Sequence, residues 1–336
     1  MVKGSVGAAG SAGPPEQDRR FVEARVGAVE RSWGPRAVIA QDGPAAGRRQ
    51  IDLRHLGGLE VTVEADNFLD LGSASFNGRP VSFVAPTTSD RADSWARRWQ
   101  GGLLTTCGLT AVGQAEPADG GTHGRAHLVP ATVTRAGGQW SDDGAYSLAV
   151  EGIMREGAIF EQNLTVQRSI TANIGRSAVR VFDVIRNEGF GDEPVRILYH
   201  INLGWPLLHG GATVTAEATA PEATDASEQA TWTRELVDPE TLAPEKVDAL
   251  IPQADGEGWS TATLRGDDGT VTVTFRPEQL PYLTIWRSPA AGSYALGIEP
   301  GTCWPNHAEG PDHGKAGRML APGESFDVEI IIEFGS

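Results

Sequence analysis

The stretch QIDLRHLGGLEVTV, residues 50–63, carries the pattern that best predicts the fold of this chain. Its second half, Leu59 to Val63, alternates apolar and polar side chains, which is typical of a strand with one buried face. Gly57-Gly58 separates this half from a first strand, and a glycine pair of this kind favours a tight turn. The segment therefore predicts two antiparallel strands joined by a hairpin.

Similar short alternating runs recur along the chain, with Gly, Asn, Asp or Pro between them. Asn77-Gly78 is a hairpin-type dipeptide and precedes another such run, VSFV, at residues 81–84. The remaining runs are residues 146–150, 164–169, 179–185, 197–201, 270–275, 294–298 and 326–334. Helical periodicity is rare, and the best helix candidate, Pro239 to Leu250, is short. We therefore expect an all-β fold with little helix, a large antiparallel sandwich.

Composition narrows the class of protein. The 336 residues include 28 basic and 44 acidic side chains, so the formal net charge is 28 − 44 = −16. This balance disfavours nucleic-acid and anionic-membrane partners, because both need a basic protein face. A chain of this length buries enough surface to fold without a metal or disulfide, and two cysteines are too few for a disulfide framework. With 40% hydrophobic and 21% charged residues, the composition is that of a globular protein and not of a disordered one.

The sequence favours one β-sandwich domain over residues 21–336, preceded by a disordered leader at residues 1–20. A polar stretch at about 213–258 is rich in Ala, Thr, Glu, Asp and Pro, and we interpret it as an excursion from the sandwich. No apolar run is long enough for a signal peptide or a membrane span, so we expect a cytoplasmic protein. A sheet edge could pair two copies into a homodimer.

Four segments concentrate polar and aromatic side chains among glycines. They are residues 95–109 (WARRWQGGLLTTCGL), 122–127 (THGRAH), 198–208 (LYHINLGWPLL) and 297–304 (GIEPGTCW). The third and fourth place one titratable side chain each on a predicted strand, His200 and Glu299. Glu299 ends a strand before a Pro-Gly turn, where a carboxylate can act as a general base or simply lie exposed at the rim. His200 can donate a proton near neutral pH or serve as a hydrogen-bonded structural residue.

The same segments offer groups that bind sugars. Five tryptophans lie in or near them, at positions 95, 99, 205, 286 and 304, and we expect two of the five to line a pocket. Planar donors suited to sugar hydroxyls are Arg97 and Asn202, the latter on the same strand face as His200. A metal site built from His123, His127, His200 and Glu299 is a less favoured alternative.

Together the four segments resemble the aldose 1-epimerase (galactose mutarotase-like) superfamily, and in particular its branch of "aldose 1-epimerase family" proteins. The matching motifs are GGLLTTCGL, HGR followed by Pro130-Ala131, YHINLGWPLL and LGIEP, with a closing LAPGE at residues 320–324. They occur in the order typical of the family and span roughly residues 50–333. The resemblance implies a β-supersandwich.

The resemblance also implies a chemistry that requires no cofactor. It assigns Glu299 as the base that takes the proton of the anomeric hydroxyl and His200 as the acid that protonates the ring oxygen. His123 resembles a sugar-binding histidine and Arg97 a substrate-binding arginine. To these we add three expected substrate contacts on the grounds of residue type and position: Asn202, Arg125 and Trp286.

Two departures from the family pattern bear on the substrate. Branch members carry Asp-Arg-Gly-x-Asp after the second strand, whereas this chain has DNFLD at residues 66–70, without the arginine. No residue matches the sugar-binding aspartate of mutarotases, whose expected position falls within residues 213–258. Two alternatives therefore stay open. One is an isomerase, epimerase or lyase that uses the same site on an oxidised sugar, with or without a metal, and the other is a non-catalytic carbohydrate-binding protein.

Overall fold

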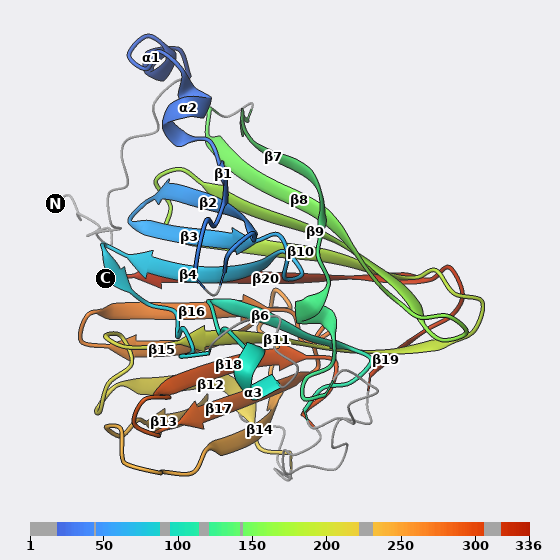
Figure 1. Ribbon diagram of the computed structural model, residues 1–336. Coiled ribbons are helices and arrows are strands. Elements are labelled where there is room, and N and C mark those ends of the chain that lie inside the picture. The colour runs from blue at the N-terminus through green and yellow to red at the C-terminus, as the bar shows by residue number, and fades with distance from the viewer. Residues whose placement is uncertain are drawn as a thin grey trace, which may run out of the picture.

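The computed structural model describes residues 19–43, 45–87, 95–113, 121–141, 144–221, 231–305 and 317–336 (Figure 1). The leader expected at residues 1–20 lies almost wholly outside this part of the chain. Helices in the described part are short: α1 (Arg19–Glu23), α2 (Val29–Trp33), α3 (Trp95–Arg98) and the 3₁₀ helix η2 (Ala126–Leu128). None of these helices is long and apolar enough to cross a membrane.

The strands form two large antiparallel sheets. The order in the first, from pairwise hydrogen bonding, is β1-β2-β3-β4-β6-β11-β18-β17-β14. Its strands are β1 (Arg36–Ile39), β2 (Arg49–Leu56), β3 (Leu59–Glu64), β4 (Asp70–Phe76), β6 (Leu104–Leu109), β11 (Glu193–Leu203), β18 (Ala295–Gly301), β17 (Tyr282–Ser288) and β14 (Lys246–Pro252). The short β5 (Arg79–Pro80) completes the hairpin predicted at Asn77-Gly78.

The order in the second sheet is β7-β8-β9-β10-β20-β16-β15-β12-β13. Its strands are β7 (Thr132–Trp140), β8 (Tyr146–Gly157), β9 (Asn163–Asn173), β10 (Ala178–Asn187), β20 (Ser325–Gly335), β16 (Gly269–Phe275), β15 (Ser260–Gly266), β12 (Thr213–Thr219) and β13 (Thr231–Glu235). A short pairing of β12 with β14 joins the two sheets, and β19 (Arg318–Leu320) pairs with β11. The expected all-β supersandwich is confirmed.

Alternation along the strands builds the core between the sheets. In β16, Val271, Val273 and Phe275 are fully buried, while the threonines between them are partly exposed. Strands with this period turn one apolar face inward and one polar face outward. At the predicted β2–β3 turn, Gly57 has φ +62°, and a Cβ there would lie 2.7 Å from the carbonyl oxygen of Gly175. Glycine at this position lets two loops approach closely.

The structure corrects the expectation of a helix at Pro239 to Leu250. Residues 246–252 instead form strand β14, which pairs antiparallel with β17 through Val247 and Trp286. Pro244 lacks the N–H that a helix requires, and the backbone groups after it are satisfied by the neighbouring strand. The stretch 213–258, interpreted from its composition as an excursion, contains β12, β13 and β14, so much of it is part of the sheets.

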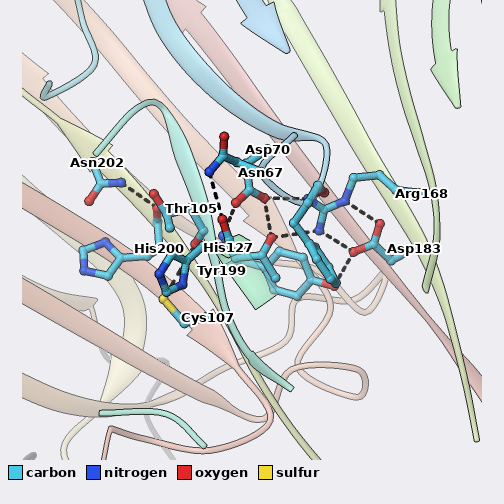
Figure 2. Close-up of polar contacts among 12 residues, drawn as sticks. Asn67, Asp70, Thr105, Cys107, His127, Arg168, Asp183, Tyr199, His200 and Asn202 are labelled. Carbon is cyan, nitrogen blue, oxygen red and sulfur yellow. Dashed lines mark hydrogen bonds and ion pairs between the residues drawn. The ribbon is translucent and has the colours of Figure 1, made fainter. Parts of the chain in front are cut away.

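A buried charge network links the two sheets across the core (Figure 2). The guanidinium of Arg168 on β9 donates from Nε and Nη2 to the carboxylate of Asp183 on β10, at 2.8 and 2.7 Å. Its Nη1 donates to Asp70 Oδ1 on β4 at 2.7 Å, and Nη2 donates to Thr106 Oγ1 on β6 at 3.0 Å. The hydroxyl of Tyr199 on β11 donates to Asp183 at 2.7 Å. Strands β4, β6 and β11 of the first sheet are thereby tied to β9 and β10 of the second.

Candidate functional site

A pocket of about 510 Å³ lies over the first sheet, where β11, β18 and β17 are neighbours. Its walls come from these strands, from α3 and the residue that follows it, from the loop before η2 and from the start of β14. The lining residues are Trp95, Trp99, Thr122, His123, His200, Glu245, Val247, Thr284, Trp286, Glu299 and Pro305. Three of the four segments singled out in the sequence therefore contribute to one cavity through His123, His200 and Glu299, and the segment at residues 95–109 contributes two tryptophans.

His200 and Glu299 meet inside this pocket. They lie on adjacent strands, β11 and β18, and His200 Nε2 is 3.0 Å from Glu299 Oε1. Only 4% of His200 and 2% of Glu299 is exposed. Gly297 precedes Glu299 by two residues on the same strand face, and a Cβ there would lie 2.3 Å from Glu299 Oε1 and 2.9 Å from His200 Cε1. The absent side chain at position 297 leaves the space that the pair occupies.

Burial dominates the electrostatics of Glu299. It raises the pKa of this carboxyl well above the ordinary value of 4.5, and the negative charge of Glu245 raises it further. A carboxyl group with a raised pKa holds its proton closer to neutral pH and is a stronger base once ionised. His200 and Glu299 are thus a closely spaced pair in which one group can act as an acid and the other as a base.

Tryptophan rings form one side of the pocket. Trp95 and Trp99 are stacked with ring centroids 4.9 Å apart, and Trp99 meets Trp286 edge-on at 6.1 Å. The imidazole of His200 lies 5.7 Å from Trp99 and 5.5 Å from Trp286, between centroids. Three of the five tryptophans considered in the sequence therefore line the pocket, against an expectation of two. Trp304 is buried in the core and Trp205 is exposed.

His123 reaches the pocket from a tightly turned loop. Its φ is +63°, and its backbone carbonyl accepts a hydrogen bond from the N–H of Gly108 on β6 at 2.9 Å. The N–H of Gly113 donates to His123 Nδ1 at 3.3 Å, so Nδ1 is the acceptor nitrogen and Nε2 can carry the proton. The rings of His123 and His200 are perpendicular, with centroids 5.8 Å apart. Both imidazoles therefore face the same cavity.

Three of the residues expected to bind substrate do not line the pocket. Asn202 is buried, and its amide nitrogen donates to the carbonyl oxygens of Gly102 and His200 at 3.0 and 2.9 Å, so it holds the backbone beneath His200 (Figure 2). Arg97 is exposed on α3. Arg125 is half-exposed, with Nε 3.5 Å from the carboxylate of Glu156.

The four residues of the metal alternative do not act as one ligand set. His127 is buried, and burial together with the positive charge of Arg98 lowers its pKa to about 4. Among the residues that the structure describes, no group of three or more His, Cys, Asp or Glu side chains is arranged to hold a metal ion.

Two polar pocket residues were not singled out from the sequence. Thr284 on β17 pairs with Glu299 on β18, and its buried hydroxyl has no hydrogen-bond partner in the described part of the chain. Glu245 precedes β14, and its Oε2 accepts a hydrogen bond from Trp286 Nε1 at 2.8 Å. Glu245 belongs to residues 213–258, the stretch in which no sugar-binding aspartate could be assigned. The polar composition around it offers no signal that distinguishes it from its acidic neighbours.

Solved structures of low sequence identity share this fold. A candidate aldose 1-epimerase from Klebsiella pneumoniae superposes with a TM-score of 0.76 at 20% identity, covering 89% of this chain and 83% of that one. A galactose mutarotase-like protein from Clostridium acetobutylicum gives 0.61 at 14% identity, with coverage of 90% and 98%. Galactose 1-epimerase from Lactobacillus acidophilus gives 0.57 at 14% identity, with coverage of 89% and 98%. The resemblance to this superfamily, inferred from the sequence motifs, is confirmed at the level of the fold.

Sequence comparison assigns the family. No curated protein matches the chain. The family model DUF4432, described as a domain of unknown function, matches residues 45–334 and so covers every residue that lines the pocket. The protein therefore belongs to the DUF4432 family and has a galactose mutarotase-like fold.

Proposed function

We propose that the protein interconverts the anomers of an aldose, with Glu299 as general base and His200 as general acid. The observation that carries this proposal is the buried contact of 3.0 Å between His200 Nε2 and Glu299 Oε1 inside a pocket of about 510 Å³. A positioned acid and a positioned base each contribute typically about 10²- to 10⁴-fold to a proton-transfer reaction.

The chemistry suits two adjacent groups. Opening a sugar ring requires removal of the proton from the anomeric hydroxyl and addition of a proton to the ring oxygen. These two oxygens are bonded to the same carbon, so an acid and a base that lie side by side can reach both. As the base takes the hydroxyl proton, the bond between the anomeric carbon and the ring oxygen breaks and leaves an open-chain aldehyde. Rotation about the adjacent carbon–carbon bond and the reverse transfers give the other anomer.

The raised pKa of Glu299 supports its role as base. Catalysis by an acid–base group is most efficient when its pKa lies near the working pH, and burial moves this carboxyl in that direction. The group must be ionised to accept a proton, so we expect the rate to fall as the pH drops through the raised pKa.

The other pocket walls support a sugar ligand. Trp95, Trp99 and Trp286 offer apolar faces to the C–H surfaces of a sugar ring. The buried hydroxyl of Thr284 and the imidazole of His123 supply hydrogen-bonding groups for sugar hydroxyls.

Charge in the pocket favours an uncharged aldose over an oxidised one. Two carboxylates, Glu245 and Glu299, line the cavity, and within the described residues its lining includes no lysine or arginine. A sugar acid would therefore add a further acidic group to a cavity that offers no lysine or arginine among its described lining residues, which is unfavourable in a partly buried site. We rank chemistry on oxidised sugars below mutarotation for this reason.

The test is mutarotation measured by polarimetry or proton NMR on freshly dissolved pure anomers of several aldoses. Wild type, Glu299→Gln and His200→Gln are compared with the spontaneous rate, and Glu60→Gln serves as an exposed control on β3. We expect acceleration by wild type and by the control, and a loss of about 100-fold or more in kcat/KM for each site variant.

Sugar binding, followed through the fluorescence of the pocket tryptophans, separates the alternatives. Binding that survives in Glu299→Gln while turnover is lost supports an enzyme. Binding by wild type without acceleration of any aldose or oxidised sugar would support a carbohydrate-binding protein and would falsify the proposal.

A further inference from the structure

We propose that Glu245 is a positioning residue of this site, which anchors the indole of Trp286 and sets a negative charge on the pocket wall shared with Glu299. The inference rests on the proposed function in one respect, because the consequence for turnover assumes that Glu299 acts as the base. The anchoring of Trp286 by Glu245 does not depend on that assumption.

The first support is the contact between Glu245 and Trp286. The indole Nε1 of Trp286 donates to Glu245 Oε2 at 2.8 Å, and this is a hydrogen bond to a charged acceptor. Glu245 directly precedes β14, whose residue Val247 pairs with Trp286 on β17. The carboxylate therefore holds a ring whose backbone is already fixed by the sheet, and it selects one orientation of that ring.

The second support is what the anchored ring contacts. The Trp286 centroid lies 5.5 Å from that of His200 and 6.1 Å from that of Trp99. Free rotation of the indole would change one wall of the cavity and the packing against the acid of the pair. Glu245 acts on the site through Trp286.

The third support is the charge environment of Glu299. The titratable groups that face or influence it come from several elements: His200 on β11, His123 on the loop before η2, Cys107 on β6 and Glu245 before β14. Glu245 is the acidic group of this set, apart from Glu299 itself, and it raises the pKa of Glu299 after the larger effect of burial. Since Glu245 is exposed, solvent and salt screen its effect.

Two substitutions separate the anchor from the charge. Glu245→Gln keeps an oxygen that can accept the indole hydrogen bond but removes the charge, whereas Glu245→Ala removes both. Glu60→Gln on β3 removes an exposed negative charge away from the pocket lining and is the matched control.

The first readout needs no substrate. In protein labelled with ¹⁵N-tryptophan, the indole N–H signal of Trp286 is assigned by its loss in Trp286→Phe. We expect this signal to stay near its wild-type position in Glu245→Gln and Glu60→Gln, and to move toward that of a solvent-exposed indole in Glu245→Ala. An unmoved signal in Glu245→Ala overturns the anchor.

The second readout is the pH dependence of kcat/KM for the aldose that wild type turns over. We expect its acid limb to lie at lower pH in both Glu245 variants than in wild type, with a difference that shrinks at high salt. Glu245→Ala is also expected to raise KM about 3- to 10-fold, the size of one lost hydrogen bond. Acid limbs that coincide with wild type overturn the role of the charge.

A third readout distinguishes failure of this inference from failure of the proposed function. The stability of Glu299→Gln relative to the parent protein reports the titration of Glu299 without any sugar. We expect the stability of Glu299→Gln relative to its parent to rise with pH and then level off. This levelling should occur at lower pH when the parent is Glu245→Gln than when the parent is wild type. If wild type accelerates no anomer exchange, the proposed function fails, while this titration and the indole signal still decide the role of Glu245.

Discussion

Arg168 is the side chain whose removal should damage the fold most. The residue is 1% exposed, and its guanidinium donates to Asp183, Asp70 and Thr106, which come from three different strands. Arg168→Met keeps a side chain of similar length and removes the charge. Asp183 and Asp70 are then left in the core at 0% and 4% exposure without a cation.

The expected cost follows from what remains. Breaking a buried ion pair by removing one partner costs about 3–5 kcal/mol, because the other charge stays buried. Asp70 keeps two hydrogen bonds from Thr106, and Asp183 keeps one from Tyr199, so each carboxylate still has a hydrogen-bond donor. We therefore expect a loss of about 4 kcal/mol in the free energy of unfolding at pH 7, which lowers Tm by about 6 °C for a chain of this size.

The sign of the pH dependence provides a second check. Burial already raises the pKa of Asp70 in spite of the opposing attraction of Arg168, and loss of the cation raises it further. A carboxyl group whose folded-state pKa exceeds its unfolded value lends stability below the unfolded value, and this stability is lost as the pH rises through the folded-state pKa. The deficit of Arg168→Met should therefore be smaller near pH 4 than at pH 7.

Denaturant unfolding at pH 4 and pH 7, followed by circular dichroism, measures both quantities. The triple variant Arg168→Met, Asp70→Asn, Asp183→Asn removes all three charges and should recover most of the loss. Arg155→Met, at an exposed hydrogen bond to Asn163, should cost less than about 1 kcal/mol. The reasoning is refuted if Arg168→Met loses less than about 1 kcal/mol at pH 7, or if its deficit does not change with pH.

Two further predictions concern the site. Gly297→Ala should lower kcat/KM by about 100-fold, because its Cβ would displace the side chains of Glu299 and His200. Gly137→Ala on β7 has open space around the added carbon and should leave turnover unchanged. Equal activity of the two variants would contradict the close approach at Gly297. Glu299→Gln should be more stable than wild type at neutral pH, since wild type loses stability between the ordinary pKa of 4.5 and the raised pKa in the folded state. Melting curves of both proteins from pH 4 to pH 8 test this prediction. The stability difference between Glu299→Gln and wild type should be near zero at pH 4 and should grow as the pH rises. A difference that does not grow with pH would count against a buried, uncompensated carboxyl group at position 299.

Local pattern was sufficient to predict much of the fold. The β2–β3 hairpin, the turn at Asn77-Gly78 and β16 follow from alternation and turn residues that lie next to one another in sequence. The segment at 239–250 shows where this approach fails. Its backbone is organised by pairing with β17, some 35 residues farther along, and no local signal reports that partner. Strand formation here depends on tertiary context more than on intrinsic propensity.

The residues of the site also fall into two groups: those that local sequence predicts and those that only the fold brings together. His200, Glu299 and His123 could be singled out because each is a titratable residue in a segment that contains glycines, and Trp286 because it is an aromatic residue near one of these segments. Glu245 could not, since an acidic residue in a polar stretch is ordinary until the fold brings it to Trp286.

Arg168 shows the same limit for the core. Its neighbours Gln167 and Ser169 lie on the other face of β9, so alternation alone places Arg168 among the buried positions, where an arginine is rarely expected. Only the two carboxylates that the neighbouring strand and the opposite sheet supply, Asp183 and Asp70, make that position tolerable.

Strand β11 connects the network to the chemistry. Tyr199 and His200 are consecutive, so their side chains leave opposite faces of the strand: the tyrosine toward Asp183 in the core, the histidine toward the pocket (Figure 2). Asn202 fixes the same strand by bonding the carbonyl oxygen of His200. A buried charge network is weak evidence for stability, because an apolar core could replace it. In this protein the network fixes the position of β11, because its hydrogen bonds are directional. This matters for the site, since an acid–base pair tolerates little displacement.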